Sequence, residues 1–112
     1  MHSVAETKVF SRRADALLTQ TERMELIAML ANDPLAGDLV PGLGGIRKLR
    51  FAAGGRGKSG GFRVIYYVLT DDLPILAMLI YGKNEQSNPT PEQRRALLAA
   101  VDELKRAVRG SA

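Results

Sequence analysis

The chain has 112 residues, of which 46% are hydrophobic and 25% are charged, the composition of an ordinary globular protein. This length predicts one domain over residues 1–112 that needs no disulfide or metal support. The absence of cysteine excludes a thiol nucleophile and is typical of a cytoplasmic protein. The formal net charge of +4 favours an acidic partner, and the longest apolar run, Ile75–Tyr81, is too short to span a membrane.

The N-terminal third predicts a strand followed by a helical hairpin. The apolar residues of Ser3–Phe10 make it a candidate strand. A short helix is expected over Ser11–Leu18, with Ser11 as its N-cap. Thr19 and Glu22 then have the spacing of a capping box, which starts a second helix, and the sequence Asn-Asp-Pro at 32–34 ends it.

Three strands and a final helix are expected in the rest of the chain. No element is expected over Asp33–Gly45, and β-branched and apolar residues then predict strands over Ile46–Ala52, Phe62–Thr70 and Leu73–Lys83. The sequence TPEQ at 90–93 combines a capping box with proline at the first helical position, and Gly110 ends the helix it starts. The order β-α-α-β-β-β-α with short links predicts an α+β fold, with an antiparallel sheet core, a helical hairpin and a C-terminal helix.

The stretch Gly42–Tyr67 combines most of the glycines with many basic residues, and no acidic residue occurs between Asp38 and Asp71. Such a cluster repels itself unless an anion offsets its charge. Strand alternation lets basic side chains from three strands converge on one face of the sheet, beside two tyrosines whose rings can stack on bases. We therefore expect a polyanion site, for RNA above all, that includes Arg47, Lys48, Arg50, Arg56, Lys58, Arg63, Tyr67, Tyr81 and Lys83.

Ordinary structural explanations stand beside this one. The sequence GGRGKSGG is not a nucleotide-binding phosphate loop, because Ala52 stands where that pattern needs glycine and a strand follows where it needs a helix. It is either a plain hairpin loop or a loop that adapts to phosphates. Tyrosines more often pack in a core, and single strand lysines often protect sheet edges. The acidic residues lack metal-ligand spacing and His2 is the only histidine, so we expect no metal, no cofactor and no catalytic histidine.

The motifs GGIRKLR, GKSGGFRVIYY, IYGKNE and TPEQR follow one another along the chain. In this order they resemble the RelE-like toxins of bacterial type II toxin–antitoxin systems, and most closely the HigB-type branch, over nearly the whole chain. The resemblance implies the small α+β fold of that family. It also implies a cytoplasmic, metal-independent mRNA endonuclease (an mRNA interferase) that enters the ribosome and inhibits translation. The implied partners are the ribosome, messenger RNA and a cognate, HigA-like antitoxin, which contacts operator DNA through its own DNA-binding domain.

Carried over by position, the resemblance implies that Arg63 stabilises the scissile phosphate. Because clustered cations favour the neutral amine of a neighbouring lysine, Lys58 or Lys83 is the expected proton-transfer group. The founding RelE pattern has arginine where this chain has Asn84, and a tyrosine a few residues later that this chain lacks. The expected catalytic residues are Arg63, Lys58 and Lys83, and the expected RNA and ribosome contacts are Arg47, Lys48, Arg50, Arg56, Tyr67, Tyr81 and Asn84.

Two other functions fit the same sequence. ParE-like relatives share the fold but inhibit DNA gyrase and lack the basic catalytic set. A non-catalytic RNA-binding module would have the same charge pattern and would bind RNA without releasing a cleaved product.

Overall fold

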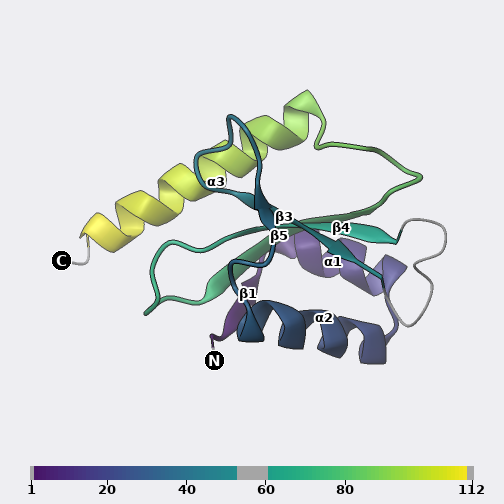
Figure 1. Ribbon diagram of the computed structural model, residues 1–112. Helices are drawn as coiled ribbons and strands as arrows, with labels where there is room; N and C mark the ends of the chain where they lie inside the picture. The colour runs from purple at the N-terminus through teal and green to yellow at the C-terminus, as the bar shows by residue number, and fades with distance from the viewer. Residues whose placement is uncertain (1, 53–60, 111–112) are drawn as a thin grey trace.

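Helices cover both faces of one mixed sheet in the computed structural model, which describes residues 2–52 and 61–110 (Figure 1). The elements are β1 (Val4–Glu6), α1 (Lys8–Leu17), α2 (Gln20–Asn32), β2 (Asp38–Leu39), β3 (Arg47–Phe51), β4 (Phe62–Tyr67), β5 (Ile75–Gly82) and α3 (Pro91–Gly110). The strands lie side by side in the order β1-β5-β4-β3-β2. The expected α+β class is confirmed. Within the described ranges, no helix is long and apolar enough to cross a membrane.

The first helix begins earlier than the sequence predicted. Its N-cap is Thr7, whose hydroxyl accepts a hydrogen bond from the Phe10 amide at 3.1 Å. Ser11 was wrongly expected to be the cap; it lies inside the helix, and its hydroxyl donates to Glu6 at 2.7 Å. The expected strand over residues 3–10 is accordingly confined to β1. Helix geometry is favoured because it buries Phe10 and Ala14, four residues apart, on one side of α1.

The second helix begins and ends where expected. Thr19 and Glu22 form the complete capping box, each satisfying a backbone N–H of the other. Beyond it, the segment in which no element was expected contains the short strand β2, paired antiparallel with β3. A tight loop joins the two strands, and Gly42, Gly44 and Gly45 have φ of 76°, 62° and 104°. These left-handed conformations let the chain reverse within a few residues, and β-carbons would strain them.

The expected antiparallel pairing holds for the strands from β2 to β5. β1 instead runs parallel to β5 and forms the other edge of the sheet. β5 therefore lies inside the sheet, and most of its residues are buried, which accounts for its continuous apolar run. The β4–β5 register skips Met78, since Ile65 pairs with Leu79 and Tyr66 with Ala77, so that β5 carries a bulge.

The two faces of the sheet have separate apolar cores. One core packs α1 and α2 against residues such as Leu49, Phe51 and Tyr66, and the other includes Ile65, Tyr67 and residues of α3. Inside the first core, the Gly37 amide donates to the buried Tyr66 hydroxyl at 2.8 Å. Strand alternation therefore divides the residues of β3 and β4 between the two faces.

Candidate functional site: a basic end of the sheet

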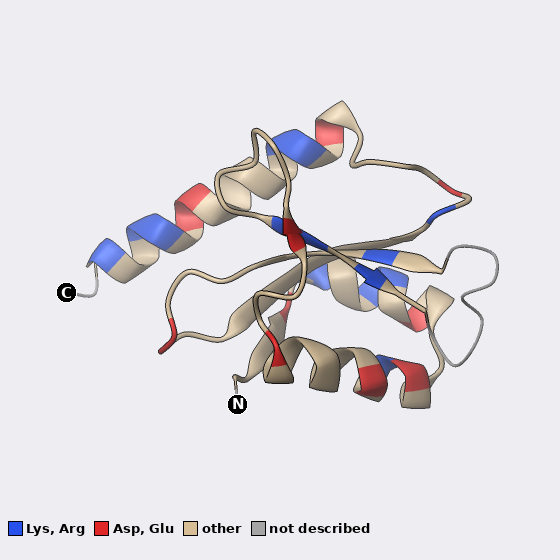
Figure 2. Ribbon diagram, in the orientation of Figure 1, with Lys and Arg blue, Asp and Glu red and all other residues tan. Residues whose placement is uncertain are grey.

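Basic residues lie where β3, β4 and β5 reach one end of the sheet, as the blue segments of the ribbon show (Figure 2). Arg50 pairs directly with Arg63, and Arg63 pairs with Tyr81, so that the three residues form one row across the strands. Lys48 lies two residues before Arg50 on the same face of β3. We call Lys48, Arg50 and Arg63 the basic face. The structure thus brings together these predicted site residues from two separate strands.

The Arg50–Arg63 pair is unfavourable for the sheet itself. Directly opposite residues have Cβ atoms about 4.5–5.5 Å apart, and like charges in such positions destabilise the pair. Arg50 is exposed and Arg63 is half-buried, so water screens the repulsion only partly. A bound anion would turn this repulsion into attraction, because each guanidinium presents a planar set of donors to phosphate oxygens.

The loop between β5 and α3 covers part of the same end of the sheet. Lys48 Nζ donates to Asn88 Oδ1 at 3.4 Å, and the Tyr81 hydroxyl donates to the Ser87 carbonyl oxygen at 3.4 Å. Asn88 was not among the predicted site residues, and no local pattern could have found it, since it is 40 positions from Lys48. This loop therefore joins the basic face to the start of α3.

Tyr81 forms part of the floor beneath the basic face. Its side chain is 0% exposed, so its ring is not available for stacking on a base in this conformation. Burial raises the pKa of the Tyr81 hydroxyl, and the positive charge of Arg63 opposes this shift. The hydroxyl is therefore a protonated hydrogen-bond donor at neutral pH.

Lys83 and Asn84 occupy the turn that follows β5, and both are exposed. The Lys83 amide donates to the Gly61 carbonyl oxygen at 3.1 Å, which ties this turn to the start of β4. Because Arg63 pairs with Tyr81, Lys83 is its diagonal neighbour, and long side chains reach across such diagonals. The register thus places Lys83, in the turn after β5, next to the row of Arg50, Arg63 and Tyr81.

Two predicted contacts lie elsewhere. Arg47 alternates to the opposite side of β3 from Lys48, and its Nη1 donates to the Gly37 carbonyl oxygen at 2.7 Å, which holds the loop before β2. Tyr67 is 5% exposed within the α3-side core, and Lys105 Nζ lies 6.0 Å from the centre of its ring. The structure does not bring these residues to the basic face. The predicted residues Arg56 and Lys58 lie outside the described residues.

The described residues include no group of three or more histidine, aspartate or glutamate side chains placed to hold a metal ion. The basic face and the turn beside it offer arginine and lysine cations together with amide donors. Such a set binds phosphates and stabilises negative charge that develops on them.

Comparison with known proteins supports the architecture. No family model matches the chain. Among solved structures, a mutant of the Escherichia coli toxin RelE in the free state is similar, with a TM-score of 0.55 and 16% sequence identity. The match covers 76% of this chain and 86% of that chain. The chain therefore has a RelE-like fold.

Proposed function

We propose that this protein is the toxin of a bacterial type II toxin–antitoxin system, of the HigB-type branch, and that it cuts messenger RNA on the ribosome. The observation that carries the proposal is the Arg50–Arg63 pair, two arginines directly opposite each other on a sheet whose fold is RelE-like. Like charges in this register repel, and an RNA phosphate would offset both of them.

The proposed reaction uses the RNA's own 2′-hydroxyl as the nucleophile. Its oxygen bonds to the adjacent phosphorus while the bond from phosphorus to the 5′-oxygen breaks, which leaves a 2′,3′-cyclic phosphate and a 5′-hydroxyl. One proton leaves the 2′-hydroxyl and one reaches the departing 5′-oxygen. Arg63 would donate to the phosphate oxygens as their charge grows, a contribution typically worth about 3–4 kcal/mol for one placed donor.

The turn and the glycine-rich loop would supply the proton transfers. Lys83, exposed beside the basic face, would serve as one proton-transfer group, and Lys58 as the other candidate. Lys48, Arg50 and Arg56 would hold flanking phosphates, and Asn84 would contact RNA or ribosome where the founding family pattern has arginine. With no histidine in the set, correct orientation of the substrate by the ribosome would supply much of the rate.

The partner that neutralises the toxin would be a HigA-like antitoxin in the cytoplasm. An antitoxin that covers the basic face must offset the charges of Lys48, Arg50 and Arg63, so acidic residues are expected on its contacting surface. Charge reversal at Arg50 should then weaken the complex, whereas a contact elsewhere on the toxin would leave the affinity unchanged.

Primer extension on a defined message tests the proposed activity. Reactions with and without translating ribosomes would compare the wild type with Arg63→Gln. Cuts that fall within codons, need ribosomes and are lost in the variant support the proposal. RNA binding without cleavage would instead indicate an RNA-binding module. If the folded protein neither binds nor cuts RNA, a supercoiling assay would test for a gyrase inhibitor.

A further inference from the structure

α1 completes the hydrogen bonding of β5 where β1 ends. The last pair between β1 and β5 is Glu6 with Ala77, so the β5 edge is bare beyond it. Thr7 then donates to two carbonyl oxygens of β5, through its amide to Ala77 at 3.0 Å and through its hydroxyl to Met78 at 3.1 Å. Arg13 Nε donates to the next outward-facing carbonyl oxygen, that of Ile80, at 2.5 Å. Arg13 thus lies along the edge of β5.

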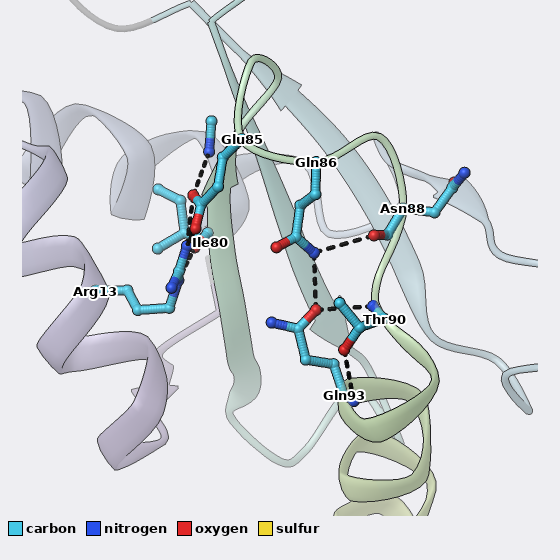
Figure 3. Close-up of polar contacts among 8 residues, drawn as sticks. Arg13, Ile80, Glu85, Gln86, Asn88, Thr90 and Gln93 are labelled. Atoms are coloured by element: carbon cyan, nitrogen blue, oxygen red, sulfur yellow. Dashed lines mark hydrogen bonds and ion pairs between the residues drawn. The ribbon is translucent and has the colours of Figure 1, made fainter.

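The same guanidinium continues to the turn that follows the strand (Figure 3). Arg13 Nη2 donates to both carboxylate oxygens of Glu85, at 2.6 and 2.5 Å. Glu85 Oε1 also accepts from the Gly82 amide at 3.3 Å, and the Glu85 amide donates back to the Gly82 carbonyl oxygen at 3.0 Å. The turn that carries Lys83 and Asn84 is therefore closed on itself and attached to α1 through Arg13.

A second set of bonds fixes the far end of the same loop. Gln86 Nε2 donates to the Asn88 carbonyl oxygen at 3.0 Å and to Gln93 Oε1 at 2.7 Å. Gln93 Oε1 also accepts from the Thr90 amide at 2.9 Å, as part of the N-terminal cap of α3 (Figure 3). This end of the loop is thus anchored to α3 and the Lys83 amide is bonded to Gly61, while the Arg13–Glu85 pair attaches the turn to α1.

We propose that Arg13 is a positioning residue for the site. It acts through Glu85 to hold Lys83 and Asn84 beside Arg63, and it pairs with a carboxylate that would otherwise repel a phosphate near the exposed lysine. This inference rests on the proposed function for its effect on cleavage, but not for its effect on the turn. It assigns a role to a helix residue that none of the sequence motifs contains.

Two substitutions of Arg13 and one of Glu85 distinguish the positioning role of Arg13 from an effect of its positive charge alone. Arg13→Ala removes every bond to the turn, and Arg13→Lys keeps the charge without a planar fork that can reach Ile80 and Glu85 together. Glu85→Gln keeps an acceptor oxygen while it removes the carboxylate. Arg12→Ala is the matched control, because Arg12 is exposed on the same helix and makes no hydrogen bond or ion pair that involves another described residue.

Kinetics on programmed ribosomes give the first readout. We expect Arg13→Ala to lower kcat about 10-fold to 100-fold, with a smaller change in KM. A displacement of catalytic groups by about 1 Å can reduce the rate by this much. Arg13→Lys should recover only part of the loss, Glu85→Gln should lose less than Arg13→Ala, and Arg12→Ala should match the wild type. An Arg13→Ala enzyme whose kcat equals that of Arg12→Ala would overturn the proposal.

Amide hydrogen exchange gives a readout that needs no activity. Arg13→Ala should speed exchange of the Lys83, Glu85 and Gln86 amides by at least about 10-fold, because their local opening no longer breaks the attachment to α1. Amides of β4 should exchange as in the wild type. If the wild type fails to cut RNA, the proposed function fails while this test still stands. Unchanged exchange in the turn would refute the positioning role even in an active enzyme.

Discussion

The Arg50–Arg63 pair predicts that one substitution stabilises the fold and weakens RNA binding at once. Arg50→Gln keeps most of the side-chain stem and removes one charge of a directly opposed pair. At the dielectric constant of water, two unit charges about 8 Å apart repel by about 0.5 kcal/mol, which is a lower limit here because Arg63 is half-buried. This value lies within the range of about 0.2–1 kcal/mol for cross-strand pairs. The variant should therefore unfold at a temperature about 2–4 °C above that of the wild type.

The salt dependence of the stability gain distinguishes a loss of charge repulsion from a change in packing. Thermal unfolding should be followed by circular dichroism at low ionic strength and again at about 1 M salt, where the Debye length falls to about 3 Å. The gain in stability should be largest at low salt and should shrink at high salt. Arg106→Gln, which removes an exposed arginine of α3 outside the basic face, is the matched control and should not show the same gain.

RNA binding supplies the other half of the prediction. If Arg50 contacts one phosphate of a single strand, its loss should reduce the slope of log affinity against log salt by about 0.7, whereas the α3 control keeps the wild-type slope. A destabilised Arg50→Gln protein, or a stabilised one with unchanged RNA affinity, would refute the view that the repulsion is tolerated for the sake of a ligand.

Three further predictions concern the fold. Tyr66→Phe should destabilise the protein by about 1–3 kcal/mol in urea denaturation, because a buried backbone N–H loses its acceptor, and an unchanged midpoint would contradict this. Gly61→Ala should destabilise by more than about 1 kcal/mol, because φ is 62° and a Cβ would lie 2.6 Å from a β3 carbonyl oxygen. Gly82→Ala, where a Cβ meets open space, is its control. The hydrogen bond from Arg23 lowers the pKa of Glu6 below 4.5, so this carboxylate contributes stability above pH 4.5 that is lost as pH falls through its folded-state pKa. The free energy of unfolding, measured from pH 7 to pH 3, should therefore fall less steeply for Glu6→Gln than for the wild type.

The sequence was sufficient to predict the elements that depend on local patterns of residues. Capping boxes at Thr19 and Thr90 predicted the starts of two helices, and both form as expected. Period-two alternation also places Lys48 and Arg50 on the face of β3 opposite Leu49 and Phe51, because that other face is buried against α1 and α2. The convergence of basic residues on one face follows from the same rule.

Features that depend on distant parts of the chain were missed. β2 was not expected, because it consists of two residues and forms only where three left-handed glycines turn the chain back onto β3. Ser11 resembled a cap, but Thr7 takes that role, since it also meets the edge of β5 at Met78. The hydrogen bond between Arg13 and Glu85 joins residues 72 positions apart, so no local sequence pattern could predict it.

Single-turnover cleavage of a defined message on programmed ribosomes is the measurement that tests the central claim most directly. The enzymes to compare are the wild type, Arg63→Gln and the control Arg106→Gln, each first shown to be folded. The proposed role of Arg63 predicts a rate about 10²–10³-fold lower for Arg63→Gln and an unchanged rate for the control. Equal rates for all three proteins, or no cleavage by the wild type, would contradict the assignment of this basic face as a ribonuclease site.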